Sequence, residues 1–226
     1  MLQPSRCLLT LALTALCAPG CDRSHEAVGV DQSGTDPTPE PATAAGPLAA
    51  AMPAANTRAD RAAWRARLHW PDDCEDAFEA SDASADAGLG IHELRDGVVL
   101  VQVRCAAGAY QPSSLVMYVD ATRTPSVATA MTFLTYASPD GAQLERVDTR
   151  ELWGEMSFAQ GGQVLTVLSL SRQTADCGTW TEYSFAEGTP RLVALYARLP
   201  CPTVPGAPVD PAPGQPPADW KRMDVQ

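Results

Sequence analysis

Four cysteines in the body of the chain are the side chains best suited to chemistry: Cys74, Cys105, Cys177 and Cys201. A thiolate can attack a substrate, ligate a metal or be oxidised to a disulfide. The close CxxC or HxxxH pairs of a zinc site are absent from the sequence. Asp176 would raise the pKa of the neighbouring Cys177 thiol rather than lower it. The pattern therefore favours two disulfides over a catalytic thiolate or a metal site.

The cysteine pairing is left open by the sequence, because four cysteines allow three arrangements. We predict Cys74–Cys105 and Cys177–Cys201, one bridge in each half of the chain. Each bridge would close a loop of about 25–30 residues and stabilise the fold by roughly 3 kcal/mol in the chain-entropy model. After Cys177, Gly178 would permit a tight turn and Trp180 would pack inward.

Two carboxylates beside an aromatic residue are the other candidate for catalysis. Glu151 and Glu155 flank Trp153, as in sites that cleave sugars, although alternation along a strand explains the same spacing. The histidines that could assist are His25, His69 and His92. The sequence has no G-x-S-x-G, no HExxH and no phosphate-binding glycine loop. We predict no catalytic residue, no metal site and no cofactor.

Two charged segments precede the strands. Thr57 and Asp60 form a capping-box pattern, so a short helix is expected over Thr57–Arg67. Its arginines are either a solvated face or a contact for anionic lipid: Arg58, Arg61, Arg65 and Arg67. Asp72–Asp86 contains seven acids and no base, and lacks the pattern of a calcium loop. It is either a solvated helix or loop, or a docking surface for a basic partner.

From Ile91 onward the apolar residues alternate with a period of two, which is typical of strands. The predicted strands are Val98–Arg104, Leu115–Val119, Val164–Leu170, Trp180–Phe185 and Leu192–Arg198. Turns are expected at Ser138–Gly141 and Ala159–Gly162, and a helix is an alternative only at Val127–Phe133. We therefore predict a mainly β, antiparallel meander domain with one or two short helices, stapled by disulfides.

An offset of 65 residues suggests two similar halves. Identical residues recur at Gly97 and Gly162, Val99-Leu100 and Val164-Leu165, Tyr118 and Tyr183, Ala121 and Ala186, and Thr124-Pro125 and Thr189-Pro190. The expected domain thus consists of two related β-meanders.

The N-terminus predicts export. Arg6 precedes an apolar run, Cys7–Ala18, of about a dozen residues, too short to span a bilayer as a helix. Residues 1–20 thus read as a secretory signal peptide. Cys21 follows a small residue and resembles the lipidated cysteine of bacterial lipoproteins, although the usual leucine at minus three is missing and proline stands at minus two. We predict lipidation at Cys21, with plain secretion as the alternative.

Residues 21–56 form the predicted tether. They are rich in Pro, Ala, Thr, Gly and Asp, and cannot bury enough surface to fold. About 35 flexible residues would reach roughly 30 Å from a membrane. The single β-rich domain is then 57–226, with a Pro-rich loop at 202–218. The expected location is the periplasmic face of a bacterial membrane, or the soluble periplasm if Cys21 carries no lipid.

Two cysteine motifs resemble a bacterial family catalogued as domain of unknown function 1176. The stretch Leu94–Gln111 is similar to its first motif, an apolar strand, a cysteine, two residues, then Gly-Ala-Tyr and Asn or Gln. Asp176-Cys177-Gly178, the strand through Phe185 and the final cysteine are similar to its second motif.

The resemblance covers about Trp70–Trp220, with Asp219-Trp220 similar to a late Asp-Trp of the family. The chain departs from the family pattern after Cys201, where Pro202-Thr203 replaces the usual Arg-Gly. The resemblance implies an exported β-rich domain and no assigned activity.

The net charge of the chain limits which classes of molecule it can bind. The chain carries −11 at neutral pH, which argues against nucleic acid as a partner. An acidic, disulfide-bonded, membrane-anchored domain suits the capture of basic proteins by electrostatic steering. We expect a non-catalytic envelope module that binds a protein or a cell-wall ligand, for example an inhibitor or immunity protein against a toxin or wall hydrolase. A structural envelope lipoprotein and an enzyme acting on the cell wall are the alternatives.

Overall fold

The computed structural model describes residues 54–82, 84–123, 126–138 and 143–225. The predicted signal peptide, Cys21 and nearly all of the predicted tether lie outside these residues, as does most of the predicted turn at Ser138–Gly141. Across the described ranges, no helix is both long enough and apolar enough to cross a membrane.

Antiparallel strands dominate the described chain. The helices are α1 (Arg58–Leu68) and α2 (Asp72–Ser81). The strands are β1 (Leu89–Arg95), β2 (Val98–Ala106), β3 (Ser113–Asp120), β4 (Val127–Ala130), β5 (Phe133–Ala137), β6 (Glu145–Thr149), β7 (Glu151–Trp153), β8 (Glu155–Ala159), β9 (Val164–Leu170), β10 (Gly178–Ser184), β11 (Arg191–Arg198) and β12 (Lys221–Met223). Strands hold 43% of the described residues and helices 13%, so the prediction of a mainly β domain is confirmed.

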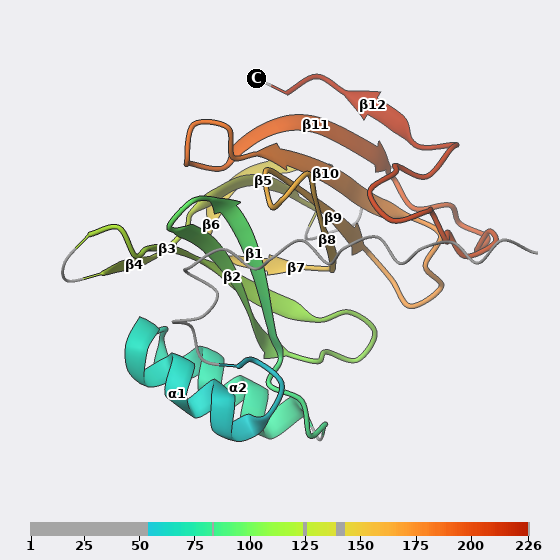
Figure 1. The fold of residues 1–226 in the computed structure, drawn as a ribbon. Helices are drawn as coiled ribbons and strands as arrows, with labels where there is room; N and C mark the ends of the chain where they lie inside the picture. Colours follow the sequence, from blue (N-terminus) through green and yellow to red (C-terminus); the bar gives the residue numbers. More distant parts are fainter. Residues whose placement is uncertain (1–53, 83, 124–125, 139–142, 226) are drawn as a thin grey trace, which may run out of the picture. The chain divides into compact units, whose positions relative to one another are not determined.

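The strands form two five-stranded sheets and one hairpin (Figure 1). In the first sheet the order is β1-β2-β3-β4, and β7 also pairs with β3. In the second sheet the order is β12-β11-β10-β9-β8, and β5 and β6 form the separate hairpin. Each large sheet therefore contains a four-stranded meander in chain order, β1 to β4 and β8 to β11.

The two central hairpins have the same register. Leu100 lies opposite Tyr118 in β2–β3, and Leu165 lies opposite Tyr183 in β9–β10. Adding 65 to the residue numbers of the first pair gives the residue numbers of the second pair. The predicted repeat thus relates two hairpins with the same cross-strand pairing.

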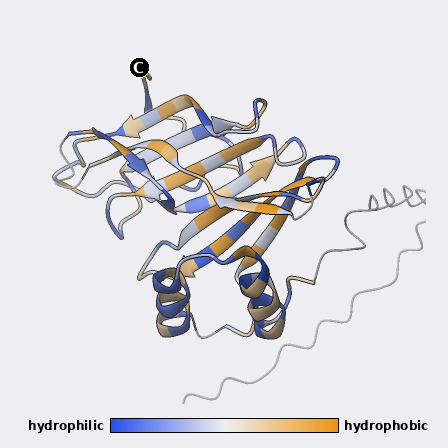
Figure 2. Cartoon of the chain, turned by 90° about the vertical axis from the view of Figure 1, so that its left-hand side faces the viewer, coloured by the Kyte–Doolittle hydropathy of each residue, from blue (hydrophilic) through white to orange (hydrophobic). Residues whose placement is uncertain are grey.

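Both helices pack on one face of the first sheet (Figure 1). Thr57 caps α1 by accepting a hydrogen bond from the Asp60 backbone, and the Asp60 carboxylate accepts one from the Thr57 backbone, as the capping-box pattern predicts. Trp64 and Leu68 then face Val101 and Val103 of β2 in one buried cluster. Figure 2 shows polar and apolar residues alternating along both helices, as expected for elements with one buried side.

The opposite face of the first sheet packs on the second sheet. Leu100 and Val116 contribute from the first sheet, and Leu165 and Tyr183 from the second. The chain passes from β7 to β8 through Gly154, where a β-carbon would lie 2.3 Å from the Leu168 carbonyl oxygen. Only glycine allows this close approach of the two sheets.

The Pro-rich segment packs on the outer face of the second sheet. Val209 lies against a buried cluster formed by Trp180, Ala194 and Trp220. After the segment, β12 pairs with β11 and extends the sheet by one strand. Trp180 is buried, but it packs beneath the Pro-rich segment on the outer face rather than inward between the two sheets.

The helix considered at Val127–Phe133 is not present. Val127–Ala130 is β4, paired with β3, and Phe133 begins β5. Ala128 and Ala130 pack against the helix-side core, whereas Phe133 belongs to the core between the sheets. Pairing with the edge of the first sheet therefore prevails over the short helical pattern.

Candidate functional site

Both predicted disulfides are present. Cys74 of α2 is bonded to Cys105 of β2, with the Cα atoms 4.5 Å apart. Cys177, directly before β10, is bonded to Cys201, with the Cα atoms 5.4 Å apart. These four cysteines are therefore structural. In the part of the chain that the structure describes, no group of His, Cys, Asp and Glu is arranged to hold a metal ion.

Asp176 ties the β9–β10 turn to the Pro-rich segment. Its buried carboxylate accepts hydrogen bonds from Arg172 Nε at 2.7 Å and Arg172 Nη2 at 2.6 Å. It also accepts from Thr174 Oγ1 at 2.6 Å and from the Gly206 backbone at 2.8 Å. The hydrogen bonds from Arg172, then those from Thr174 and Gly206, hold the Asp176 pKa far below its usual range.

Gly178 completes the Asp-Cys-Gly motif. Its φ is +151°, and a β-carbon there would lie 2.1 Å from the Ser169 carbonyl oxygen. Asp176 and Cys177 thus hold the Pro-rich segment, and Gly178 lets β10 pair closely with β9. Cys177 is neither a nucleophile nor a metal ligand.

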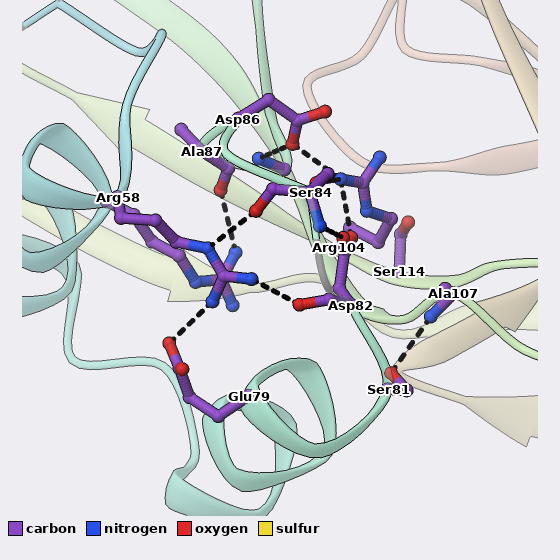
Figure 3. Close-up of polar contacts among 12 residues, drawn as sticks. Arg58, Glu79, Ser81, Asp82, Ser84, Asp86, Ala87, Arg104, Ala107 and Ser114 are labelled. Carbon is purple, nitrogen blue, oxygen red and sulfur yellow. Dashed lines mark hydrogen bonds and ion pairs between the residues drawn. The ribbon is translucent and has the colours of Figure 1, made fainter.

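Arginines of α1 and β2 pair with the acids that follow α1, and Figure 3 shows the pairs made by Arg58 and Arg104. Five of the seven acids in Asp72–Asp86 contact an arginine. The ion pairs are Arg65–Asp72 at 2.6 Å, Arg61–Glu75 at 2.8 Å, Arg58–Glu79 at 2.7 Å, Arg104–Asp82 at 2.6 Å and Arg104–Asp86 at 2.5 Å. A docking surface for a basic partner, the alternative considered for Asp72–Asp86, therefore offers fewer free carboxylates than the composition implies.

Phe78 lies at the centre of this network. The guanidinium carbons of Arg61, Arg58 and Arg104 lie 3.6, 4.2 and 5.7 Å from the centre of its ring. Arg61 is buried and donates to Glu75, which also accepts from the indole of Trp70 at 3.0 Å. Burial raises the Glu75 pKa, but these hydrogen bonds outweigh it and the pKa is lowered. We interpret the network as the attachment of the helices to the first sheet.

Glu151 and Glu155 do not share a cavity. Glu151 lies in β7 and lines a small cavity between the sheets. Glu155 begins β8, beyond the bend at Gly154, and lines two other hollows. The structure thus does not bring the two carboxylates to either side of one bound sugar. The intervening Trp153 is 53% exposed.

Gln111 joins the two sheets. Its side-chain amide donates to the Leu168 carbonyl at 3.2 Å and accepts from the Leu170 backbone at 2.9 Å. Gln111 therefore continues the hydrogen bonding along the edge of β9, past the residue where its pairing with β8 stops. Gly108, with φ of +67°, allows the turn, because a β-carbon there would lie 1.8 Å from the Gln111 carbonyl oxygen.

Tyr110 is the large side chain of this turn that faces solvent. It is 49% exposed and lines a groove of about 580 Å³ on the outer side of the second sheet. The floor includes Leu168 and Trp180, and residues 209–215 of the Pro-rich segment form the opposite wall. We call this hollow the Tyr110 groove. Glu155 and Asp210 line it, and no lysine or arginine does.

A second hollow opens on the inner side of the same sheet. It encloses about 180 Å³ between β7, the β5–β6 hairpin and strands β9 and β10. We call it the hydroxyl cavity, because its lining includes Thr135, Thr149, Ser169, Thr179 and Thr181.

The described histidines lie outside both hollows. His69 ends α1 with a left-handed backbone, φ 54°. His92 of β1 stacks on Phe158 of β8 at 3.8 Å between ring centres, and burial lowers its pKa. His25 lies outside the described residues.

The sequence did not point to either hollow. Thr179 and Thr181 alternate on one face of a strand, a pattern that signals polar groups on a buried face. The groove could not be predicted, because it depends on where the Pro-rich segment lies on the second sheet.

Two packed antiparallel sheets, two helices and two disulfides define a small disulfide-bonded β domain. A family model described as protein of unknown function (DUF1176) matches residues 15–213, and the chain belongs to this family. The predicted resemblance is thereby confirmed. No curated protein and no solved structure matches the chain.

Proposed function

We propose that the chain is a non-catalytic binding module of the bacterial cell envelope, exported by residues 1–20 and anchored through a lipid on Cys21. The two disulfides support an extracellular or periplasmic location, because such bonds persist in oxidising compartments. The proposed tether, residues 21–56, would let the folded domain reach targets away from the membrane.

The Tyr110 groove is the observation that carries the binding function. Gly108 and Gln111 have structural roles in their turn, whereas Tyr110 exposes half of its surface beside the groove. Exposed aromatic residues beside an apolar floor are typical of binding sites.

The opposite wall of the groove is held in place before any ligand arrives. Cys201 is bonded to Cys177, Gly206 donates to Asp176, and the Val209 backbone donates to the Ala175 carbonyl at 2.6 Å. A wall fixed in this way loses little conformational entropy on binding, which favours affinity.

The charges of the groove favour a basic protein segment as its ligand. Glu155 and Asp210 contribute carboxylates, and the groove lining includes no basic side chain. The net charge of −11 would attract such a partner from a distance. An inhibitor of a basic toxin or wall hydrolase fits this chemistry. We place the contact at the groove rather than at α2, where arginines already pair with most of the acids.

Cross-linking in the host tests this proposal. The tagged full-length chain is cross-linked in intact cells, and the proteins that co-purify are identified by mass spectrometry. We expect one dominant basic envelope protein, which is lost with Tyr110→Ala and retained with Val204→Ala. Val204 is a suitable control because it is 78% exposed and lies outside the groove.

A diffuse set of abundant wall and membrane proteins would contradict the binding proposal and favour the structural lipoprotein. Cleavage of wall sugars or peptides by the purified chain would instead favour the enzyme.

A further inference from the structure

The hydroxyl cavity presents polar groups on a face that otherwise packs in a core. Ser169 and Thr179 lie directly opposite each other in β9–β10, and Val167 and Thr181 form the next pair. Leu165 and Tyr183 follow on the same face and are fully buried. This face of β9 and β10 is apolar or aromatic where the two sheets pack directly against each other. It carries hydroxyl groups where the cavity opens.

Two of the cavity's hydroxyls, those of Ser169 and Thr179, are not used by the fold. Among the described residues, neither the Ser169 nor the Thr179 side chain has a hydrogen-bond partner, and both line the cavity. A hydroxyl that can both donate and accept is a versatile partner for a ligand hydroxyl.

Tyr183 follows Thr181 on the same face of β10, in the core next to the cavity, and is not part of the cavity lining. The Tyr183 hydroxyl is buried and makes no well-aligned hydrogen bond to any described residue. Burial raises its pKa, although Thr135 and Thr181 lie close enough to oppose this effect.

The rim supplies an aromatic surface and a charge. Trp153 is 53% exposed and lines the cavity beside Tyr136. A flat, exposed indole can stack on the C–H face of a sugar ring. Glu151 also lines the cavity and no lysine or arginine does, so an anionic ligand would meet repulsion without compensation.

We propose that the hydroxyl cavity binds one uncharged sugar ring, such as a terminal or protruding unit of an envelope glycan. The cavity volume of about 180 Å³ lies below the range of roughly 300–1,000 Å³ that holds drug-sized ligands. One ring fits, and the remainder of a glycan would extend past Trp153 into solvent. This site is independent of the proposed protein partner, because Thr181 and the Tyr110 groove lie on opposite faces of the second sheet.

Saturation-transfer NMR on the purified full chain tests the sugar site. The probes are glucose and N-acetylglucosamine, with glucuronate as the anionic comparison. We expect transfer to the ring protons of at least one neutral sugar at millimolar concentration, and much weaker transfer to glucuronate.

Two variants locate the binding. Thr181→Val removes one hydroxyl while preserving the side-chain shape, and should weaken binding about three- to tenfold, the effect of one lost hydrogen bond. Trp153→Ala changes an exposed side chain, so the fold should persist while binding falls about tenfold or more. Thr166→Val is the matched control, because Thr166 lies on the neighbouring strand and lines the groove on the other face.

The proposal is overturned if neither neutral sugar shows transfer, if glucuronate binds as well as they do, or if Thr181→Val and Trp153→Ala bind like the unmodified chain. Tyr110→Ala should leave sugar binding unchanged. That variant therefore separates failure of the sugar site from failure of the protein-binding proposal.

Discussion

Arg172 and Asp176 form a two-point ion pair, with Nε to Oδ1 at 2.7 Å and Nη2 to Oδ2 at 2.6 Å. The same carboxylate accepts from the backbone of Gly206, thirty residues further along the chain. One charged group thus holds both the β9–β10 turn and the Pro-rich segment that forms a wall of the Tyr110 groove.

Asp176→Asn should lower the thermal unfolding midpoint by several degrees. The amide carries no negative charge, and only one of its two polar atoms can accept the hydrogen bonds that the carboxylate receives from Arg172, Thr174 and Gly206. Asp224→Asn, a change at an exposed position near the C-terminus, serves as the control and should have little effect. An unchanged midpoint for Asp176→Asn would contradict the role assigned to this residue.

Asp176 should also shape the acid sensitivity of the fold. Its pKa in the folded protein lies below the unfolded value of about 3.9, so its contribution is complete above that pH and is lost as the pH falls towards the folded value. Urea unfolding should be measured from pH 6 down to about pH 2. The difference in the free energy of unfolding between the unmodified chain and Asp176→Asn should become smaller below about pH 4. A difference in the free energy of unfolding that does not change with pH would contradict the ion pair.

Gln111→Ala should destabilise the domain by about 1–3 kcal/mol, because it leaves the Leu168 carbonyl and the Leu170 amide without their partner. Urea unfolding measures this change. The neighbouring Tyr110→Ala is the matched comparison and should remain within about 0.5 kcal/mol, since its side chain is exposed. Equal effects of the two variants would refute the bridge between sheets.

Glu75→Gln should reduce stability by about 3 kcal/mol, because it leaves the buried Arg61 without an opposite charge. Asp76→Asn, an exposed change on the same helix, should alter stability by less than about 0.5 kcal/mol. Calorimetry or urea unfolding compares the two. If both changes are neutral, the helices are not held to the first sheet by this network.

Cys21→Ser should release the chain from the membrane, because the proposed lipid could no longer be attached. Fractionation of host cells should find the unmodified chain in the detergent-soluble membrane fraction and Cys21→Ser in the soluble fraction. Cys17→Ser, within the predicted signal peptide, should behave like the unmodified chain. Membrane retention of Cys21→Ser would contradict the anchor.

The strands could be predicted because their apolar residues alternate. Val98–Arg104 and Val164–Leu170 are flanked by turn-forming residues, and both form strands in the two sheets. The capping box at Thr57 and Asp60 likewise defined the start of α1 locally. The disulfides followed from cysteine number and an assumed pairing within each half, which the structure confirms.

The sites could not be predicted because they depend on contacts between distant segments. Gln111 meets Leu168 and Leu170 more than fifty residues later in the sequence. The acidic stretch looked like a free surface, since its partners Arg58 and Arg104 come from other elements. Short-range patterns define strands and turns, whereas a groove requires the packing of the two sheets and the Pro-rich segment.

Site-specific photo-cross-linking at position 110 tests the central claim most directly. A photoreactive phenylalanine analogue replaces Tyr110 in the full-length chain, and a second chain carries it at Val204. After illumination of intact host cells, we predict one discrete adduct with a basic envelope protein from position 110 and none from position 204. The absence of an adduct at position 110, or the same adducts from both positions, would contradict the assignment of the Tyr110 groove as the binding site.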